Sequence, residues 1–344
     1  MKPIAVNARY RAHRLTGMQR YAMEIASRFS DLAESVGPAR PLTGMAGHLW
    51  EQVCLPAAAR GRVLWSPNNT GPLATYRQVC TVHDLIPLDN PEWFSPRFSA
   101  WYGWLMPRLV HQVAHIIAVS EFTRGRILER FGVRPGKVSV VPNGIDRRFS
   151  PHSRELVAQA RQDIGIPEGR YLLYLGSLEP RKNISRLLQA WARVHGRLSE
   201  DTWLVVAGAK GRSQVFAEAG VQEIPQRVHL AGYVSDERLP ALYSGALAVV
   251  YPSLYEGFGL PPLEAMACGA PVITSNTTSL PEVTGDAAIL VNPLDAEEIG
   301  EAIVRVAGDV GLRSDLSRRG LARASAYSWD MSAAMTLRVL EAYM

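Results

Sequence analysis

The chain has 344 residues, of which 47% are apolar and 20% charged, the balance of an ordinary globular protein. This length predicts about two domains, each large enough to bury a core without disulfide or metal staples. The net charge of +5 is uneven, because residues 1–160 carry 20 basic and 11 acidic side chains, whereas residues 161–344 carry 17 and 21. A basic first half fits an anionic ligand or membrane surface, and fits equally well a basic face without a function.

The three cysteines form no CxxC pair, and their odd number argues against a disulfide framework. The longest apolar region, 101–119, is interrupted by Pro107 and Arg108 and is too broken to span a membrane. No secretory signal pattern opens the sequence. We therefore expect a cytoplasmic protein.

In the first half, short β-branched runs alternate with helical patterns, which is typical of parallel α/β architecture. The predicted strands are 3–8, 63–66, 79–83, 115–120 and 138–142. The predicted helices between them are 18–32, 96–112 and 121–131. A turn signal, NGID at 143–146, follows the last of these strands.

The second half repeats this alternation. Its predicted strands are 171–176, 203–207, 227–230, 246–251, 271–274 and 288–291. Its predicted helices are 185–197, 237–244, 261–268 and 296–306. We predict two α/β lobes joined near 149–167, with ligands at the carboxyl ends of their strands and a cleft where the lobes face each other.

The strongest motif is EGFGLPPLE at 256–264, directly after a predicted strand. Pro261 and Pro262 fit the first turn of a helix, where a missing amide hydrogen costs nothing. Gly257 and Gly259 allow close backbone approach just ahead of that turn, and the free amides of a helix start favour an anion. The alternative is an acidic helix cap followed by a solvated glutamate.

The second motif, GSLEPRKN at 176–183, also follows a predicted strand. Arg181 and Lys182 stand at the start of the next helix, where they can meet phosphate oxygens beside free amides. Lysine is scarce in this chain, with four against 33 arginines. A solvated turn is the alternative, but the motif at 256–264 in the same lobe favours a phosphate site.

These segments resemble glycosyltransferase family 4, whose members have the GT-B fold of two Rossmann-like lobes. The resembling segments, in chain order, are TGMQRY (16–21), VHD (82–84), VPNGID (141–146), GSLEPRKN (176–183), EGFGLPPLE (256–264) and YSWD (327–330). The resemblance implies an acceptor-binding lobe over 1–155, rejoined by the C-terminal helix 330–344. The donor-binding lobe would then span 156–329.

The resemblance implies a retaining transferase that moves a hexose from a nucleotide sugar to a glycan or lipid-linked glycan. Gly17 would bring backbone amides to the donor diphosphate. His83, followed by Asp84, would face the reaction centre and hydrogen-bond the transferred sugar. Arg181 and Lys182 would bind the diphosphate.

Further donor contacts are implied in the second lobe. Glu256 and the backbone amides of Gly257, Phe258 and Gly259 would hold the sugar. Glu264 would accept hydrogen bonds from the ribose hydroxyls. Because Lys182 and Glu256 stand in loops, we expect alanine at either position to leave the fold intact.

The nucleobase would lie near Tyr233 and Val234, after the strand predicted at 227–230. Two residues depart from the family's pattern. Ser177 stands where the family often has arginine, so Arg181 is expected to supply the second phosphate cation. Gln19 stands where the family frequently has glycine, and its side chain would narrow the glycine turn of the first lobe.

Other classes fit the sequence less well. It contains no Asp-x-Asp, His-x-His or HExxH pattern, so we expect no catalytic metal and no cofactor. No Gly-x-Gly-x-x-Gly follows a strand, no P-loop motif is present, and no nucleic-acid-binding motif accompanies the basic half. Two rivals stay open, a sugar-nucleotide isomerase on the same fold and a catalytically silent sugar-nucleotide-binding module.

The overall pattern looks most like bacterial mannosyltransferases of surface-polysaccharide synthesis, with GDP-mannose as the expected donor and a UDP-hexose as the alternative. Helix 96–112 is rich in aromatic residues between Arg97 and Arg108, which suits an anionic bilayer surface. We expect peripheral attachment at the inner face of the plasma membrane, with Trp101 and Leu105 packed against the sheet. The aromatic residues could instead line an acceptor groove.

Overall fold

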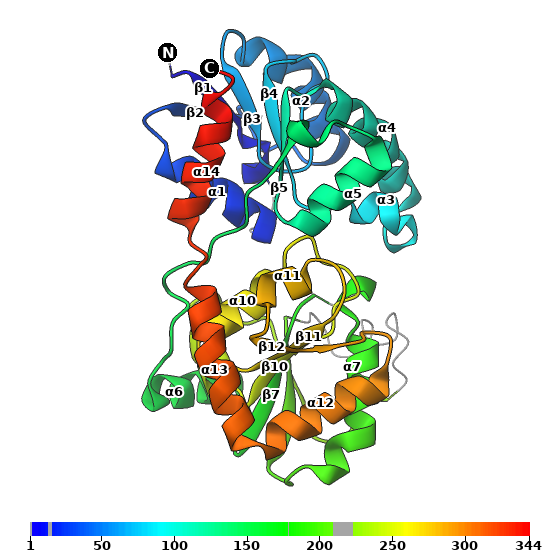
Figure 1. Cartoon of the computed structure of the whole chain (residues 1–344), viewed down its shortest axis with the longest axis vertical. Coiled ribbons are helices and arrows are strands. Elements are labelled where there is room, and N and C mark those ends of the chain that lie inside the picture. Colours follow the sequence, from blue (N-terminus) through cyan, green and yellow to red (C-terminus); the bar gives the residue numbers. More distant parts are fainter. Residues whose placement is uncertain (1, 13–15, 178, 209–222) are drawn as a thin grey trace. The chain divides into compact units, whose positions relative to one another are not determined.

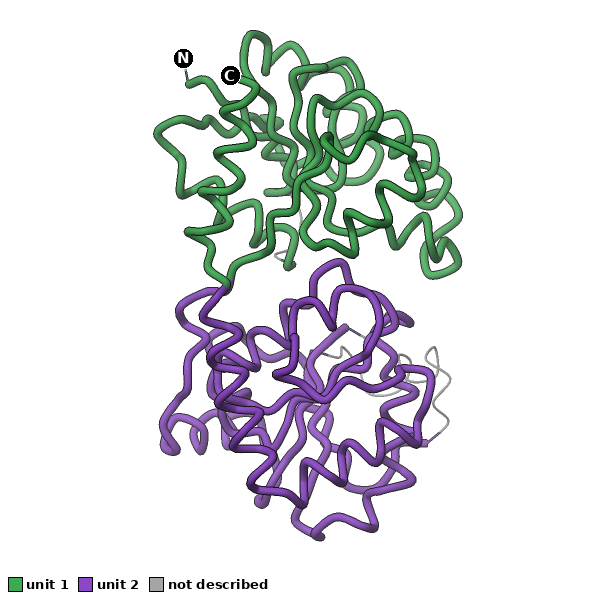
Figure 2. The backbone as a smooth tube through the Cα atoms, in the orientation of Figure 1, with its two compact units in different colours: residues 1–144, 327–344 green, residues 145–326 purple. Residues whose placement is uncertain are grey.

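The computed structural model describes residues 2–12, 16–177, 179–208 and 223–344. Two compact units make up the chain, one of residues 1–144 and 327–344 and the other of residues 145–326 (Figure 2). Each unit contains a six-stranded parallel sheet flanked by helices (Figure 1). The predicted α/β class with two parallel sheets is confirmed. The first unit ends at Gly144, earlier than the lobe boundary expected at 155.

The sheet of unit 1 is parallel throughout. Its strands, in spatial order, are β2 (Ala33–Val36), β1 (Ile4–Asn7), β3 (Val63–Ser66), β4 (Gln78–Val82), β5 (His115–Ala118) and β6 (Val138–Val140). Every residue of the four central strands is buried. This explains their near-continuous apolar sequences, because a parallel sheet is covered on both faces.

The helices of unit 1 include one from the far end of the chain. They are α1 (Gly17–Arg28), α2 (Gly44–Ala58), α3 (Ile86–Asp89), α4 (Pro96–Gln112), α5 (Glu121–Phe131) and α14 (Trp329–Glu341). Helix α14 packs against α1, and Trp329 joins the apolar cluster around β1. A Cβ on Gly144 would lie 2.2 Å from the backbone nitrogen of Trp329, so only glycine fits where the chain leaves unit 1.

Unit 2 repeats the architecture. Its strands, in spatial order, are β12 (Ala288–Val291), β11 (Val272–Ser275), β10 (Ala248–Tyr251), β7 (Arg170–Leu175), β8 (Thr202–Ala207) and β9 (Val228–Gly232). Its described helices are α6 (Arg154–Ile164), α7 (Ile184–Val194), α9 (Leu239–Gly245), α10 (Leu260–Ala267), α11 (Leu280–Thr284), α12 (Ala296–Gly308) and α13 (Val310–Ala324). Helix α6 occupies most of the segment expected to be a linker.

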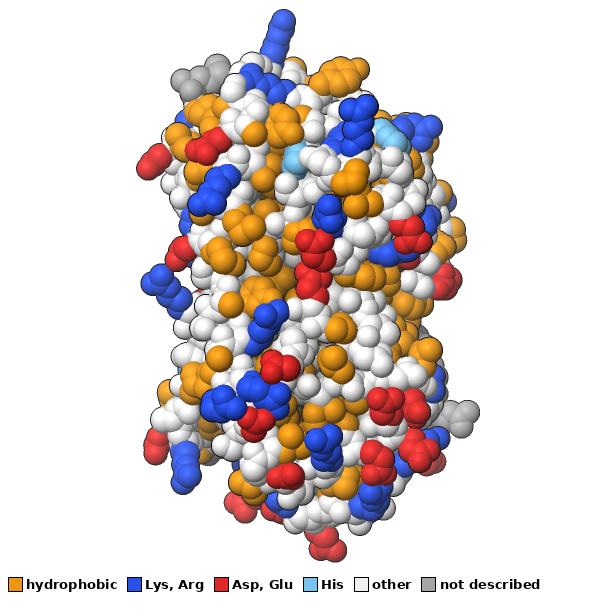
Figure 3. Space-filling model, in the orientation of Figure 1, with side chains coloured by type: hydrophobic (Ala, Val, Ile, Leu, Met, Phe, Trp, Pro, Cys, Tyr) orange, Lys and Arg blue, Asp and Glu red, His pale blue; other side chains and the backbone are white. Residues whose placement is uncertain are grey.

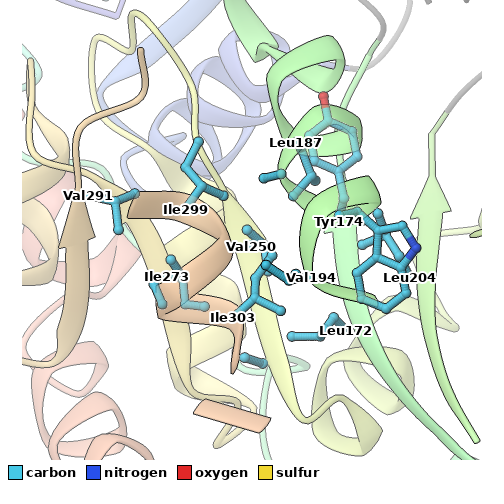
Figure 4. Close-up of a cluster of buried hydrophobic side chains, with 14 of the residues drawn as sticks. Leu172, Tyr174, Leu187, Val194, Leu204, Val250, Ile273, Val291, Ile299 and Ile303 are labelled. Atoms are coloured by element: carbon cyan, nitrogen blue, oxygen red, sulfur yellow. The ribbon is translucent and has the colours of Figure 1, made fainter. Parts of the chain in front are cut away.

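The core of unit 2 lies between the sheet and the neighbouring helices α7 and α12. Figure 4 shows Leu187 and Val194 of α7 and Ile299 and Ile303 of α12 close to strand side chains such as Val250. All of these are at most 3% exposed. This packing fixes the strands whose carboxyl-end loops carry the second lobe's motifs. No described helix of the chain is long and apolar enough to cross a bilayer.

Candidate functional site

The two motifs of unit 2 are brought together by neighbouring strands. β7 pairs with β10, and the segments that follow them are 176–183 and 252–259. The carboxyl ends of parallel strands meet at the same edge of a sheet, so both loops lie there. They are joined directly, since the backbone amide of Leu254 donates to the carbonyl of Arg181 at 2.7 Å.

Glu256 is the centre of a dense polar cluster. Its Oε1 accepts from Lys182 Nζ at 2.6 Å, from Ser253 Oγ at 2.6 Å and from the Tyr251 hydroxyl at 2.9 Å. Nη1 of Arg181 donates to both carboxylate oxygens, at 3.1 and 3.2 Å. The ammonium of Lys182 also bonds the Tyr251 hydroxyl and lies 4.9 Å from the centre of that ring. The predicted juxtaposition of Arg181, Lys182 and Glu256 is therefore observed.

Burial and charge act in opposite directions on this carboxylate. Lys182 and Glu256 are each 8% exposed. Burial raises the pKa of Glu256, but Lys182 and Arg181 outweigh that effect and lower it to about 2. Burial lowers the pKa of Lys182, and Glu256 opposes that shift. The carboxylate therefore stays ionised at physiological pH and holds the two cations at the strand ends.

A second carboxylate completes the charge balance. Arg181 Nε donates to Glu179 at 2.6 Å, and the Ser177 hydroxyl donates to the same carboxylate at 2.8 Å. Ser177, where arginine was expected from the family's pattern, thus holds Glu179 instead of adding a cation. The cluster contains two cations and two carboxylates, so its net charge is zero.

The loops around this cluster are fixed by Asn183, the last residue of the second motif, and by Ser279, which lies outside the motifs. Asn183, at a left-handed φ of 59°, donates to the carbonyls of Pro252 at 2.9 Å and Pro293 at 2.7 Å. The Ser279 hydroxyl contacts the carbonyls of Glu256 at 2.9 Å and Phe258 at 2.8 Å. These contacts join the loops that follow β7, β10, β11 and β12. They hold the glutamate and the glycine-containing backbone beside it in place.

Gly259 caps the start of α10 with a φ of 104°. A Cβ there would come within 2.7 Å of Leu280, so glycine is required for both the conformation and the space. Pro261 and Pro262 lie in the first turn of α10, as the motif predicts. Gly257 and Phe258 are buried just ahead of this turn.

Glu264 lies one turn into α10 and is 9% exposed. Its Oε2 accepts a hydrogen bond from the Tyr243 hydroxyl at 3.3 Å. Tyr233 follows β9 and is 72% exposed, whereas its neighbour Val234 is buried. The two residues expected near a nucleobase therefore differ in exposure, and only the exposed ring of Tyr233 is available to stack on a base.

His83 is buried at the end of β4 in unit 1. Its backbone amide donates to Asn69 at 2.6 Å, and its Nε2 lies 2.7 Å from the carbonyl of Pro67. Burial lowers the pKa of His83 to about 4, so the ring is neutral at physiological pH. Since a carbonyl only accepts, Nε2 carries the hydrogen and Nδ1 is left as an acceptor.

Asp84 has a local structural contact. One of its carboxylate oxygens accepts from the backbone amide of Ile86 at 3.2 Å, at the start of α3. Gly17 is exposed as the first residue of α1. Gln19 is 8% exposed and forms a capping box with Thr16, whose backbone amide donates to its Oε1 at 3.2 Å. The departure from glycine at position 19 thus stabilises the helix start.

The aromatic residues of α4 divide between the interior and the surface. Leu105 is fully buried, as predicted, and Tyr102 is 7% exposed. Trp101 is half-buried and stacks on Trp104, with ring centres 5.2 Å apart. Trp104 is 43% exposed and carries the guanidinium of Arg108 at 4.8 Å from its ring centre. Trp101 is therefore only partly buried against the interior of unit 1, and Trp104 lies on the outer surface of α4.

The site residues expected from the sequence form two groups. Gly17, His83 and Asp84 belong to unit 1, and the remaining nine belong to unit 2. Among the residues that the structure describes, no group of three or more His, Cys, Asp and Glu side chains could hold a metal ion.

Comparison with known proteins identifies the class to which this fold and these motifs belong. Residues 157–323 match the family model of glycosyl transferases group 1, and residues 62–149 match that of glycosyltransferase family 4. HepE of Anabaena, crystallised with UDP, superposes with a TM-score of 0.77 at 18% identity over 99% of this chain and 100% of that chain. The fold is that of a GT-B glycosyltransferase.

Two relatives that are more similar in sequence identify the family of the chain. It is 35% identical over 279 residues to O-antigen chain mannosyltransferase B of Escherichia coli, a match covering 79% of this chain and 72% of that protein. It is 31% identical over 271 residues to the serotype-specific mannosyltransferase WbdA of Escherichia coli, covering 76% of this chain and 33% of that protein. The chain belongs to glycosyltransferase family 4 and is a glycosyltransferase.

Proposed function

We propose that this glycosyltransferase moves mannose from GDP-mannose to a glycan or lipid-linked glycan of a bacterial surface polysaccharide, with retention and without a metal. The observation that carries the proposal is the cluster of Arg181, Lys182 and Glu256 at the ends of β7 and β10. The names of the two Escherichia coli relatives support mannose as the sugar and an O-antigen-like glycan as the acceptor.

In the proposed step, the bond between the sugar C1 and the diphosphate oxygen breaks, and a bond forms between C1 and an acceptor hydroxyl oxygen. The acceptor proton is released, and the nucleoside diphosphate leaves with the bonding electrons. Lys182 and Arg181 stabilise the negative charge that grows on the diphosphate, and losing one such donor typically costs ~3–4 kcal/mol in the barrier. A fixed pair of cations thus takes the place of a metal clamp.

The remaining site residues take the roles implied by the resemblance. Glu256 and the backbone at Gly257, Phe258 and Gly259 hold the sugar, and Glu264 binds the ribose. The exposed ring of Tyr233 stacks on the base, beside Val234. These assignments fit the burial of the glutamates and the exposure of the tyrosine.

In unit 1, the resemblance assigns the transferred sugar to His83 and the diphosphate to Gly17. The neutral His83 ring, with Nδ1 as an acceptor, suits a hydrogen bond from a sugar hydroxyl. Asp84 holds the chain after His83 by accepting a hydrogen bond from the backbone amide of Ile86, the first residue of α3. Asp84 is thus a positioning residue in this proposal.

The donor is tested by titrating the protein with GDP-mannose, UDP-glucose and the free nucleotides while following thermal unfolding. A ligand that binds only the native state raises the unfolding temperature by mass action. We expect GDP-mannose to raise it most. A UDP-hexose is the second candidate, because structures of HepE are described in complex with UDP-glucose.

Donor consumption separates transfer from the two rivals. Without acceptor, an isomerase converts the nucleotide sugar to an equilibrium mixture with its isomer, whereas a transferase only hydrolyses it slowly. A silent binding module leaves it unchanged under all conditions. Release of GDP that rises with added acceptor glycan is expected, and formation of an isomeric nucleotide sugar without any acceptor would contradict the proposal.

We also propose peripheral attachment of unit 1 to an anionic membrane on the cytoplasmic side. Met45, Leu49 and Val53 on α2 are 66%, 66% and 63% exposed and, at intervals of four residues, share one helix face. Phe98 and Trp104 on α4 are also exposed. Figure 3 shows that the basic side chains of the visible face are interspersed with acidic ones rather than gathered in one patch.

Flotation with vesicles of increasing anionic lipid content tests this attachment. Binding is expected to rise with anionic lipid and to fall as salt screens the charges. The double variant Leu49→Ser/Val53→Ser is expected to lose binding. Leu294→Ser, at a 62% exposed leucine of unit 2, is the matched control. Absence of binding at low salt, or equal binding by both variants, would remove the membrane proposal.

A further inference from the structure

Tyr251, the last residue of β10, places a hydroxyl group between two charged side chains of the cluster. The tyrosine is 1% exposed, and its hydroxyl group contacts Lys182 Nζ and, at 2.9 Å, Glu256 Oε1. An ammonium group only donates hydrogen bonds, and an ionised carboxylate only accepts them. The phenol oxygen therefore accepts from Lys182, and the phenol hydrogen points to Glu256.

Lys182 is held by this hydroxyl group and by the carboxylate. Its ammonium group has three N–H bonds. One of them donates to the Tyr251 hydroxyl and one to Glu256 Oε1 at 2.6 Å. The residues that the structure describes give the third N–H bond no partner. The ammonium group is thus fixed at two points and keeps one donor for a ligand.

The tyrosine is a more rigid support than the lysine. Tyr251 pairs with Thr274 of β11 in the parallel sheet, and the Thr274 hydroxyl donates to the Tyr251 carbonyl at 2.8 Å. The centre of the tyrosine ring lies 4.9 Å from Lys182 Nζ. A lysine side chain loses much rotamer freedom when it is ordered, whereas a tyrosine has only two side-chain torsions to fix. The strand end therefore orders the lysine before any ligand binds.

The same hydroxyl group limits how completely Glu256 neutralises Lys182. Oε1 of Glu256 also accepts from Ser253 Oγ at 2.6 Å and from Nη1 of Arg181 at 3.1 Å. The lysine therefore shares this oxygen with three other donors. Without the Tyr251 hydroxyl, the carboxylate would be the one hydrogen-bond acceptor left to the ammonium among the described residues. The ammonium group would then turn further toward Glu256.

We propose that Tyr251 is a positioning residue for the cation that meets the leaving group. Its hydroxyl group holds the Lys182 ammonium at a second point beside Glu256, so that the third N–H bond is aimed at the departing diphosphate. The role of Lys182 in this statement rests on the proposed transferase function. The alternative is a structural role, in which the hydroxyl group only stabilises the end of β10.

Tyr251→Phe removes the hydroxyl group and keeps the ring beside the ammonium group. We expect kcat to fall about tenfold, because the aim of the cation counts most when charge grows on the diphosphate. The donor KM is expected to change less than about twofold, because the ground state carries less of that charge. A structural role would lower the free energy of unfolding and leave kcat in place. Unchanged kcat in Tyr251→Phe overturns the proposal.

Tyr171→Phe is the matched control. Tyr171 is also a buried strand tyrosine, 1% exposed, and its hydroxyl donates to the carbonyl of Leu242 at 2.7 Å. It lies near the start of β7, at the opposite end of the strand from the cluster. The variant loses a buried hydrogen bond of similar kind, so it is expected to lower the unfolding temperature and to leave kcat unchanged.

A double-mutant cycle shows whether Tyr251 acts through Lys182. If the hydroxyl group only aims the ammonium group, it has nothing to aim in Lys182→Met. Adding Tyr251→Phe to that variant is therefore expected to lower kcat by less than about twofold further. A further loss of about tenfold would show that the two residues act independently, and it overturns the proposal.

A spectroscopic test needs no donor or acceptor. The chain has four lysines, so the Cε–Hε signals of a ¹³C-lysine-labelled protein are few, and the signal of Lys182 is the one absent from Lys182→Met. This signal is expected to shift in Tyr251→Phe, where the ring stays and the hydrogen bond is lost, and to stay in place in Tyr171→Phe. An unshifted signal in Tyr251→Phe overturns the proposal.

The failure of this proposal and that of the proposed function are distinguishable. If the Lys182 signal shifts in Tyr251→Phe but no donor is consumed with any acceptor, the tyrosine holds the lysine and the transferase function falls. If transfer proceeds and Tyr251→Phe retains the full kcat, the transferase function stands and the positioning role falls.

Discussion

Glu256 in unit 2 and Glu51 in unit 1 are both buried carboxylates beside an arginine, yet their hydrogen bonding differs. Both oxygens of Glu256 are bonded, to Arg181, Lys182 and two hydroxyl groups. Glu51 accepts hydrogen bonds through one oxygen, and its other oxygen lies 3.6 Å from Nδ1 of His48. The first arrangement is charge-balanced and rigid before any ligand binds. The second carries its short hydrogen bonds on one oxygen, so its two oxygens are held unequally.

The saturation of the Glu256 cluster bears on one task of a transferase, the stabilisation of the leaving group. Electrostatic stabilisation of a leaving group works best when cations are fixed in advance, because no reorganisation is then needed during the reaction. The saturated cluster around Glu256 suits this task.

Breaking the saturated cluster has the largest expected effect. Lys182→Met leaves Glu256 buried without its ammonium partner, so the free energy of unfolding is expected to fall by about 3–5 kcal/mol. Turnover is expected to fall by about 10²–10³-fold. Denaturant unfolding and steady-state kinetics measure the two effects. Alanine at either position is still expected to leave the fold intact, but the burial of both residues in an ion pair predicts a loss of stability as well.

A double variant separates stability from chemistry. Lys182→Met/Glu256→Leu removes both charges, and it is expected to regain most of the lost stability, because a buried ion pair is often replaced by apolar residues without loss. It is expected to stay inactive. Restored transfer in this variant would show that the cluster is structural only.

The next largest expected effect is the pH dependence that His83 gives to the free energy of unfolding. The folded pKa of His83 is about 4 against an ordinary value of 6.5, so the unfolded chain binds more protons between these values. The associated stability is fully present above pH 6.5 and is lost as the pH falls toward 4. Between pH 7 and pH 5, His83 is expected to contribute a loss of about 2 kcal/mol. In His83→Gln, denaturant unfolding at these two pH values should show a correspondingly smaller difference, and an identical difference would contradict the account.

Changing Glu264 sharpens the distinction between binding and turnover. Glu264→Gln keeps the size of the side chain and removes the charge that the ribose hydroxyls would meet. Ribose contacts are made equally in the ground state and the transition state, so the donor KM is expected to rise about tenfold with kcat nearly unchanged. A fall in kcat at saturating donor with unchanged affinity would contradict the ribose assignment.

Removal of metal is expected to have the smallest effect. If Lys182 and Arg181 act as the diphosphate clamp, transfer should continue at the same rate in excess EDTA. Initial rates with and without the chelator measure this directly. A loss of activity that added Mg²⁺ or Mn²⁺ reverses would show that the cation pair alone does not serve the leaving group.

The sequence predicts the central elements well, because burial makes their patterns strong. The structure has α4 and α5 at the predicted bounds, and β3 and β12 as well. Helix α2 (Gly44–Ala58) was not predicted, since its most exposed side chains are apolar and it contains Pro56. The short edge strand β2 was missed for a related reason, because two of its four residues are exposed.

The residues of the candidate site also divide into those that the sequence predicts and those that it does not. The motif residues Lys182 and Glu256 were found because they follow strands at recognisable spacings. Their partners Tyr251 and Ser253 were not, because a buried strand-end tyrosine and a loop serine look like ordinary packing. Glu51 lies on the unpredicted α2, and nothing in the local sequence reveals that a single carboxylate is buried beside residues distant in the chain.

The anomeric configuration of the transfer product tests the central claim most directly. The full chain is supplied with GDP-mannose carrying ¹³C in the sugar, mannose oligosaccharide acceptors and EDTA, and the product is read by NMR. The account predicts a new α-linked mannose, with the label transferred from the α-linked donor. A β-linked product, or label that leaves GDP only as free mannose whatever the acceptor, would contradict it.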